Sequence, residues 1–265
     1  MKSRKIAVCI GGQIRTALES IKSFNNFFKD EDIDVFIHTW YMPDVEDHTE
    51  IIEQIKTLYK PKKFLIQESK HHERLNFETM LKTICLSNEL RKDYEVENDV
   101  NYDIVVKYRF DLIFPEHIQF PKSEFLPRTI YFPISDQGII NTDYQTHGMT
   151  DVFFYGDSAT MNIATNVYKI YKFTLLPYRE LYGKSIYFYY DISDSLLSPG
   201  QLIYKHCVTH NIQTVLKRSD NGRFLEHTLF RDSVKHLDCL KDFNEIGKVY
   251  VDAFKTDDNL KNKFI

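Results

Sequence analysis

The stretch Lys5–Gly12, KIAVCIGG, decides the fold class of this chain of 265 residues. After Lys5 it is continuously apolar and partly β-branched, and the apolar run stops at two glycines. A short uninterrupted run of this kind is typical of a strand that is buried on both faces of a parallel sheet. We therefore expect a buried strand over residues 5–10, followed directly by Gly11 and Gly12.

Strands and helices alternate outward from this stretch. Further strands are expected at residues 33–37, 63–66, 102–108, 129–132, 151–155 and 213–216. The helices expected between them cover residues 16–28, 50–59, 74–97, 159–172 and 199–210. Alternation at this spacing implies βαβ units, and it predicts an α/β fold with a Rossmann-like, mostly parallel sheet flanked by helices. No linker divides the chain, so we expect a single domain with an irregular second half.

The charge balance and the cysteines exclude several classes of protein. The 34 Lys+Arg and 38 Asp+Glu residues give a net charge of −4, whereas general binders of nucleic acid or membrane surfaces carry a basic excess. We therefore expect no nucleic-acid partner, and an anionic ligand must be held by a local site. The four cysteines form no CxxC pattern, which is typical of thiols in a reducing compartment. No apolar stretch reaches the ~18–20 residues of a membrane span, so we expect a cytoplasmic protein without one.

Polar or unusual residues recur where the predicted strands end. The first strand is followed by Gly11, Gly12, Gln13, Ile14 and Arg15, the second by His38, Thr39 and Trp40, and the fourth by Arg109, Phe110 and Asp111. Ligands of open parallel sheets bind outside the carboxyl ends of the strands, where loops from neighbouring strands converge. The sequence therefore predicts a ligand site built from these three clusters.

The first cluster, GGQIR at residues 11–15, could bring backbone N–H groups close to a phosphate, with Arg15 as a charged fork. It is not a GxGxxG fingerprint, and no GK[ST] of a P-loop follows it. A tight turn between a strand and a helix explains the two glycines equally well.

The third cluster belongs to YDIVVKYRFDLIF at residues 102–114. Alternation along an extended chain places Arg109 and Asp111 on the same side. Asp111 stands among apolar residues, where an unpaired carboxylate would be costly. It should therefore have a partner, either Arg109 in a structural ion pair or a bound cation.

These segments carry a family resemblance. The segment 102–112 resembles the strand that bears the DxD metal motif in GT-A-type glycosyltransferases, with Arg109 in place of the first acid and Asp111 at the second. KIAVCIGGQIRT, DVFIHTW, YDIVVKYRFDLIF and DVFFYGDSATM together resemble the small surface-glycan transferases of bacteria and large DNA viruses, including WavE-like proteins. The resemblance spans roughly residues 4–212 and does not include the tail.

The resemblance implies transfer of a sugar from a nucleotide-diphosphate donor to a hydroxyl of a glycan or glycolipid acceptor, in surface or cell-envelope glycan synthesis. It divides the domain into a nucleotide-binding half at 1–115, an acceptor-side half at 116–212 and a C-terminal extension at 213–265. A divalent cation, Mn²⁺ or Mg²⁺, on Asp111 would neutralise the departing diphosphate. Arg109 at the first acid position leaves metal dependence open. The nucleotide pocket would be lined by Gly11, Gly12, Gln13, Arg15, His38, Trp40 and Arg109.

An inverting transfer needs a general base within reach of the acceptor hydroxyl. Asp151, at the head of DVFFYGD, is the first candidate, before the weaker candidates Asp157, Asp191 and Asp194. The aromatic residues in the segment 178–190 could form an acceptor surface or ordinary packing. His206 and His210 have the i,i+4 spacing of metal ligands, but without HExxH we expect a solvated helix face.

Two other classes of function stay open. A non-catalytic nucleotide- or glycan-binding module could keep the fold after losing the first DxD acid at Arg109. A Rossmann-type dinucleotide enzyme is disfavoured because no third glycine follows GGQ and no acid that would bind ribose ends the second strand.

Overall fold

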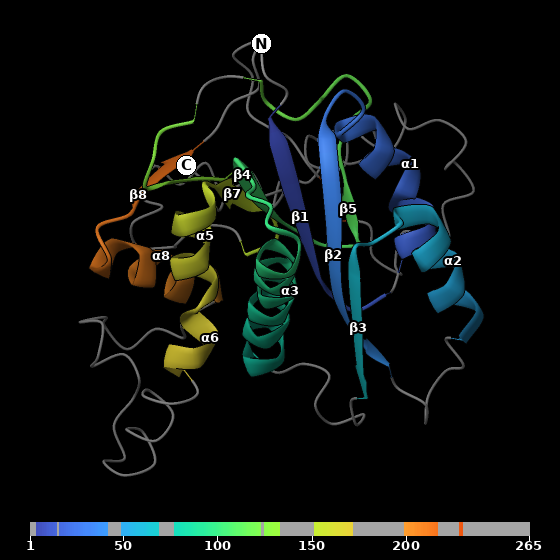
Figure 1. Ribbon diagram of the computed structural model, residues 1–265, viewed down its shortest axis with the longest axis horizontal. Helices are drawn as coiled ribbons and strands as arrows, with labels where there is room; N and C mark the ends of the chain where they lie inside the picture. The colour runs from blue at the N-terminus through green and yellow to red at the C-terminus, as the bar shows by residue number, and fades with distance from the viewer. Residues whose placement is uncertain are drawn as a thin grey trace, which may run out of the picture.

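A seven-stranded sheet forms the centre of the computed structural model (Figure 1). The structure describes residues 4–14, 16–41, 49–68, 77–122, 125–132, 151–171, 199–216 and 228–229. Across the sheet the strands are, in order, β3 (Lys63–Glu68), β2 (Asp32–Tyr41), β1 (Lys5–Gly12), β4 (Ile104–Tyr108), β7 (Phe154–Gly156), β6 (Thr129–Phe132) and β8 (Gln213–Leu216). The chain thus begins with the strand that lies between β2 and β4.

Six of these seven strands run in the same direction. β1 pairs in parallel with both β2 and β4, and β2 pairs in parallel with β3. β7 is antiparallel to its neighbours β4 and β6, and β8 is parallel to β6 at the edge. A separate antiparallel pair joins β5 (Leu112–Ile113) to β9 (Thr228–Leu229). The predicted mostly parallel sheet is confirmed, and its arrangement is compatible with a GT-A-like fold.

Helices cover both faces of the sheet (Figure 1). One face carries α1 (Ala17–Phe27) and α2 (Thr49–Tyr59). The other face carries α3 (Phe77–Asn98), α5 (Ser158–Thr165), α6 (Val167–Ile170) and α8 (Pro199–Thr209). The strand β1 contributes side chains to the hydrophobic core on both faces of the sheet. Ile6, Val8 and Ile10 point toward α1, and Ala7 and Cys9 point toward α3. This is why its sequence is apolar at every position rather than alternating.

The layer under α1 is rich in aromatic side chains. Phe27 stacks on Phe114 with ring centroids 3.8 Å apart, and it meets Phe120 and Phe153 edge to face. Phe24 meets Tyr108 of β4 in the same way. These contacts join α1 to the segments that follow β4 and precede β7, so they fix the chain on both sides of the predicted third cluster.

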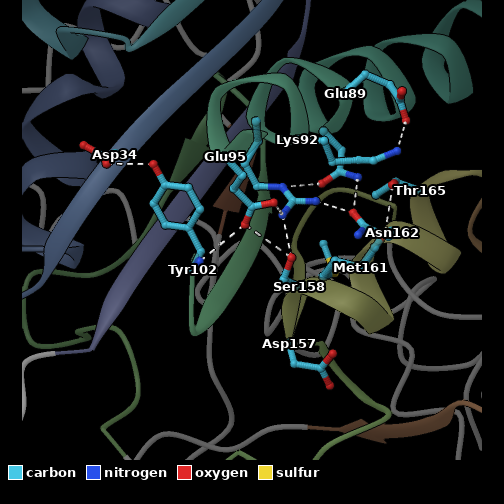
Figure 2. A network of polar contacts seen from close by, with 12 residues as sticks. Asp34, Glu89, Lys92, Glu95, Tyr102, Asp157, Ser158, Met161, Asn162 and Thr165 are labelled. Carbon is cyan, nitrogen blue, oxygen red and sulfur yellow. Dashed lines mark hydrogen bonds and ion pairs between the residues drawn. The ribbon is translucent and has the colours of Figure 1, made fainter. Parts of the chain in front are cut away.

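A buried arginine connects α3 to α5 (Figure 2). Arg91 of α3 has no exposed surface, and it donates hydrogen bonds to Asn88 and Glu95 of its own helix and to Ser158 and Asn162 of α5. Figure 2 shows Glu95, Ser158 and Asn162 converging between the two helices. Because the guanidinium is planar and carries five N–H donors, one side chain can serve four acceptors. The network holds α5, and with it the end of β7, against α3.

The second strand is longer than the sequence predicted. The expected end at residue 37 is wrong, because β2 continues to Tyr41 and pairs with β3 up to Tyr41 opposite Glu68. His38, Thr39 and Trp40 therefore lie within a strand rather than in a loop after it. Polar side chains do not end a strand whose backbone groups still have a partner strand, and this non-local pairing is invisible in the local pattern.

Other features agree with the sequence in outline. The helix expected at 159–172 is divided at Asn166 into α5 and α6, and the strand expected from residue 151 begins at Phe154. Cys9, Cys85 and Cys207 are buried free thiols, and Cys239 lies outside the described residues. No helix in the described part of the chain is long and apolar enough to cross a membrane.

Candidate functional site

The carboxyl ends of β2, β1 and β4 lie side by side in the middle of the sheet. Gly11 of β1 pairs with His38 of β2, and Ile10 pairs with Tyr108 of β4. Arg109, the next residue after Tyr108, therefore follows at the level of Gly11. The structure brings together the described members of the three clusters that the sequence placed at strand ends.

The two glycines at the end of β1 meet different requirements. A Cβ on Gly11 would stand 2.8 Å from the carbonyl oxygen of Thr83, so the glycine permits close packing of α3 on the sheet. Gly12 has φ +139, a conformation that favours glycine, and a Cβ there would meet nothing within 4 Å among the described residues. Gly11 is thus explained by helix packing, whereas Gly12 borders space that none of the described residues fills.

The residues after Gly12 form a short connection into α1. Ile14 is buried and its carbonyl accepts the N–H of Ala17 at 2.9 Å, which begins the helix. Gln13 is half-buried beside Gly12. Arg15 lies outside the described residues, so its proposed contact with a phosphate stays a prediction.

His38 and Trp40 point from β2 toward α3. His38 is fully buried, and its Nε2 lies 3.3 Å from Oε1 of Gln67 on β3. Burial lowers the pKa of His38 from 6.5 to about 4, so the ring is neutral at pH 7. With Nε2 donating to the Gln67 oxygen, Nδ1 presents a lone pair as an acceptor. The Trp40 ring stands perpendicular to the His38 ring at 5.0 Å.

Two buried nitrogen atoms of this pair have no hydrogen-bond partner among the described residues, namely Nδ1 of His38 and Nε1 of Trp40. A buried polar group without a partner costs about 1–3 kcal/mol. Nζ of Lys82 lies 4.9 Å from the centroid of the Trp40 ring, in a cation–π contact. The end of β2 therefore presents an acceptor, a donor and a cation that a ligand could use.

Lys82 is not among the site residues predicted from the sequence. It lies on α3 next to Thr83, the residue whose backbone packs against Gly11. Only the docking of α3 on the sheet brings this lysine to the strand ends. A lysine within a long helix carries no sequence signal that would distinguish it from a solvated one.

Arg109 and Asp111 form a bidentate ion pair after β4. Nε of Arg109 lies 2.9 Å from Oδ1 of Asp111, and Nη2 lies 2.6 Å from Oδ2. Asp111 is 2% exposed, so the guanidinium compensates a carboxylate that water does not reach. The ion pair with Arg109, one of the two partners expected for Asp111, is confirmed.

The Arg109 guanidinium would compete with a divalent cation for Asp111. Both of its carboxylate oxygens accept hydrogen bonds from Arg109. Within the described ranges there is no group of three or more His, Cys, Asp or Glu side chains that could hold a metal ion. Mn²⁺ and Mg²⁺ are coordinated by about six ligand atoms, most of them oxygens. The metal role of Asp111 therefore stays a prediction, and no step below depends on it.

A buried lysine adjoins the ion pair. Lys107 of β4 is 1% exposed, and its Nζ donates to the carbonyl of Val152 at 3.0 Å. Burial lowers the pKa of Lys107 from 10.5 to about 7, the Arg109 charge adds to this effect, and Asp151 and Asp111 oppose it. Asp151 is half-buried and immediately precedes Val152. The candidate base thus lies within electrostatic reach of Lys107.

The remaining candidates have other roles or lie outside the described residues. Asp157 caps α5, because its carboxylate accepts the N–H of Thr160 at 2.8 Å and that of Arg128 at 2.9 Å. Asp191, Asp194 and the aromatic segment 178–190 are not among the residues that the structure describes. Their proposed roles stay predictions.

The expected solvated face of α8 is wrong for His206. His206 is 2% exposed, and its Nε2 lies 3.0 Å from the carbonyl oxygen of Ile163 on α5. His210 is exposed, and its ring lies 4.3 Å from that of His206. The contact with α5 buries His206. The i,i+4 spacing of two histidines does not show whether either of them is buried.

Comparison with known proteins finds solved structures of weak similarity. No family model and no curated protein matches the sequence. The nucleoside-diphosphate-sugar pyrophosphorylase from Vibrio cholerae is similar with a TM-score of 0.40 and 12% identity, over 89% of this chain and 100% of that one. The apo-form glycosyltransferase GlyE of Streptococcus pneumoniae is similar with a TM-score of 0.40 and 10% identity, over 81% of this chain. The match covers 45% of the GlyE chain. Similarity this low assigns no function, and the resemblance to WavE-like proteins stays a prediction.

Proposed function

We propose that this protein is a glycosyltransferase that moves a sugar from a nucleotide-diphosphate donor to a hydroxyl of a glycan or glycolipid acceptor. The observation that carries the proposal is the unsatisfied polar set at the carboxyl ends of adjacent parallel strands. Nδ1 of His38 and Nε1 of Trp40 are buried without partners in the described part of the chain, and Lys82 lies beside them. Open α/β sheets bind nucleotides at this edge.

The donor would be held mainly through its charge and its polar edges. No described residue would stand within 4 Å of a Cβ at Gly12, so a phosphate could approach the backbone there. Lys82 and Arg109, the latter also paired with Asp111, would supply positive charge. Preorganised cations stabilise the charge that develops on a departing diphosphate. The partnerless nitrogens of His38 and Trp40 would accept and donate hydrogen bonds to the nucleoside.

The transfer itself needs one proton acceptor. Asp151 would take the proton from the acceptor hydroxyl while the hydroxyl oxygen attacks the anomeric carbon of the donor sugar. The bond from that carbon to the diphosphate oxygen breaks, and its electron pair leaves with the diphosphate. The assignment to surface or cell-envelope glycan synthesis rests on the resemblance to surface-glycan transferases.

A second candidate function has its own supporting observation. The Arg109–Asp111 ion pair occupies both oxygens of the carboxylate that GT-A enzymes offer to a metal. A non-catalytic module that binds a nucleotide or a glycan would tolerate this pair without loss. Such a module would bind a donor but would not turn it over.

Titration with UDP-, GDP-, CMP- and dTDP-sugars, with and without Mn²⁺, tests both candidates. We expect one donor class to bind, and to be hydrolysed slowly without an acceptor. Lys82→Ala should weaken this binding at least about tenfold, as expected for loss of a charge-assisted contact of ~1.5 kcal/mol or more. The matched control is Lys22→Ala, an exposed lysine of α1 on the opposite face.

Each outcome has a defined meaning. Failure of every donor to bind refutes the transferase and the nucleotide-binding module alike. Binding without turnover, even with acceptors supplied, favours the module. Mn²⁺-dependent turnover that survives Asp111→Ala would place the metal on other residues.

A further inference from the structure

The hydrogen bond between His38 and Gln67 determines what the end of β2 offers to a ligand. Gln67 lies on the neighbouring strand β3, where it is paired with Trp40 in the ladder. Its Oε1 is 3.3 Å from Nε2 of His38. Nδ1 of His38 and Nε1 of Trp40 are buried and have no hydrogen-bond partner among the described residues. Any ligand that satisfies these two nitrogens must match the roles that they play as donor or acceptor.

The role of Nδ1 depends on where His38 carries its proton. Burial lowers the pKa of His38 to about 4, so the ring is neutral at pH 7. A neutral imidazole has one N–H and one lone pair, and an amide oxygen only accepts. The contact with Oε1 of Gln67 therefore places the proton on Nε2 and leaves the lone pair on Nδ1. Since the indole Nε1 of Trp40 only donates, the two partnerless nitrogens are one acceptor and one donor.

The opposite orientation of the Gln67 amide would select another class of ligand. If its NH₂ group faced His38, it would donate to Nε2, and the proton would move to Nδ1. Nδ1 and the Trp40 indole would then be two donors close to Nζ of Lys82, which lies 4.9 Å from the centroid of the Trp40 ring. Two donors and a cation suit an anion such as a phosphate. With the amide oxygen facing His38, Nδ1 needs a donor, and an ionised diphosphate has none.

The edge of a nucleobase meets both requirements. It presents an N–H or NH₂ group next to a ring nitrogen or a carbonyl oxygen, so it can donate to Nδ1 and accept from the indole. The side chains of Gln67 and Lys82 are half-buried, so the surroundings of the two buried rings extend to the protein surface. A sugar hydroxyl also donates and accepts, and the binding experiment below separates it from a base.

We propose that Gln67 is a positioning residue that determines specificity. It fixes the proton of His38 on Nε2, so that His38 and Trp40 bind the edge of the donor's nucleobase rather than its diphosphate. The identity of the ligand rests on the proposed function, whereas the position of the His38 proton does not. Gln67 acts through His38 and does not itself contact the base.

Long-range proton–nitrogen NMR spectra of the histidine rings measure the position of the proton directly. At pH 7 the His38 ring should carry its proton on Nε2, and the variant His38→Phe identifies its signals by their loss. Gln67→Met keeps the length of the side chain and removes the acceptor. In this variant the share of His38 rings with the proton on Nδ1 should rise at least about fivefold. The same spectra show whether the variant is folded.

The matched control for the spectra is Gln54→Met. Gln54 is an exposed glutamine of α2 that donates to Glu50, and its loss should leave the His38 signals unchanged. A wild-type His38 ring with its proton on Nδ1 would overturn the inference. An unchanged His38 ring in Gln67→Met would overturn it as well.

Binding of the separate parts of a donor supplies a second readout. UMP, GMP, CMP and dTMP carry a base, whereas inorganic pyrophosphate and glucose-1-phosphate do not. Gln67→Met should weaken binding of the monophosphate that the wild type prefers about tenfold. Binding of pyrophosphate and of glucose-1-phosphate should stay within about twofold. Weakened binding of glucose-1-phosphate alone would assign the two nitrogens to a sugar hydroxyl and overturn the assignment to a base.

Failure of the inference and failure of the proposed function give different results. If the nucleoside monophosphates bind Gln67→Met as tightly as the wild type, the inference is overturned and the proposed function is untouched. If the wild type binds no nucleotide while His38 carries its proton on Nε2, the proposed function fails, and the assignment to a base fails with it. The role of Gln67 in placing the proton is then still supported by the spectra.

Discussion

Single residues at the strand ends serve packing or ligand chemistry according to what stands next to them. Gly11 and Gly12 are adjacent, yet one admits the backbone of Thr83 and the other faces open space among the described residues. Arg109 and Asp111 are two residues apart and satisfy each other. His38 and Trp40 have the same spacing, but each keeps a buried nitrogen without a partner in the described structure.

The Arg109–Asp111 pair should show strong energetic coupling. Arg109→Met removes both guanidinium hydrogen bonds from the buried Asp111 carboxylate, and we expect a loss of about 3 kcal/mol or more in the free energy of unfolding. The double variant Arg109→Met, Asp111→Leu removes both charges and should recover much of this loss. Urea denaturation of the wild type, both single variants and the double variant measures the coupling. A coupling near zero would mean that the two side chains do not meet in solution.

At the scale of elements, the helices α3 and α5 on one face of the sheet position the residues at the strand ends. α3 packs on Gly11 through Thr83 and brings Lys82 to Trp40. α5 is attached to α3 by the bonds of Arg91, and its cap Asp157 also binds the N–H of Arg128 just before β6. The stretch that precedes β7 accepts a hydrogen bond from Lys107 of β4 through the carbonyl of Val152.

Asp151 and Asp157 stand on either side of β7 and should respond to substitution in opposite ways. Asp157→Ala removes the α5 cap and should cost about 1 kcal/mol in the free energy of unfolding, with transfer activity retained. Asp151→Asn should leave the stability within about 0.5 kcal/mol and abolish transfer. Urea denaturation and a transfer assay on both variants measure these effects. Full activity in Asp151→Asn would remove Asp151 from the role of base.

Across the whole molecule, the layer between the sheet and α3, α5 and α8 holds two neutral histidines. Burial lowers the pKa of both His38 and His206 from 6.5 to about 4. A depressed folded-state pKa means that the unfolded chain binds protons more readily than the folded one between these values. Stability is therefore full above pH 6.5 and declines as the pH falls toward 4.

Acidification should accordingly weaken the fold well before the carboxylates titrate. Each histidine can contribute a loss on the order of 3 kcal/mol between pH 6.5 and 4. Urea denaturation at pH 7, 5.5 and 4.5 measures the decline. His206→Gln keeps a donor for Ile163 and removes one titrating group, so its decline should be shallower. The same slope in both proteins would show that His206 does not stay neutral in the folded state.

The strand and helix pattern was readable from the sequence alone because it depends on neighbours along the chain. The apolar run at Lys5–Gly12 predicted a central buried strand, and the period of the following segments predicted most of the helices and strands. The ends of strands that depend on pairing with another strand could not be read from the sequence. The extension of β2 through Trp40 depends on β3, whose pairing partners lie some distance along the chain.

The sequence by itself determined an α/β chain with chemically unusual residues at three strand ends. Only the tertiary structure decided which of them are satisfied. In the folded protein Asp111 pairs with Arg109, and Gly11 packs against α3. Lys82 contacts the Trp40 ring, and the buried Lys107 donates to the Val152 carbonyl. The physical reason is that a strand's secondary structure follows from local periodicity, whereas the partner of a polar side chain is chosen among groups that only folding brings together.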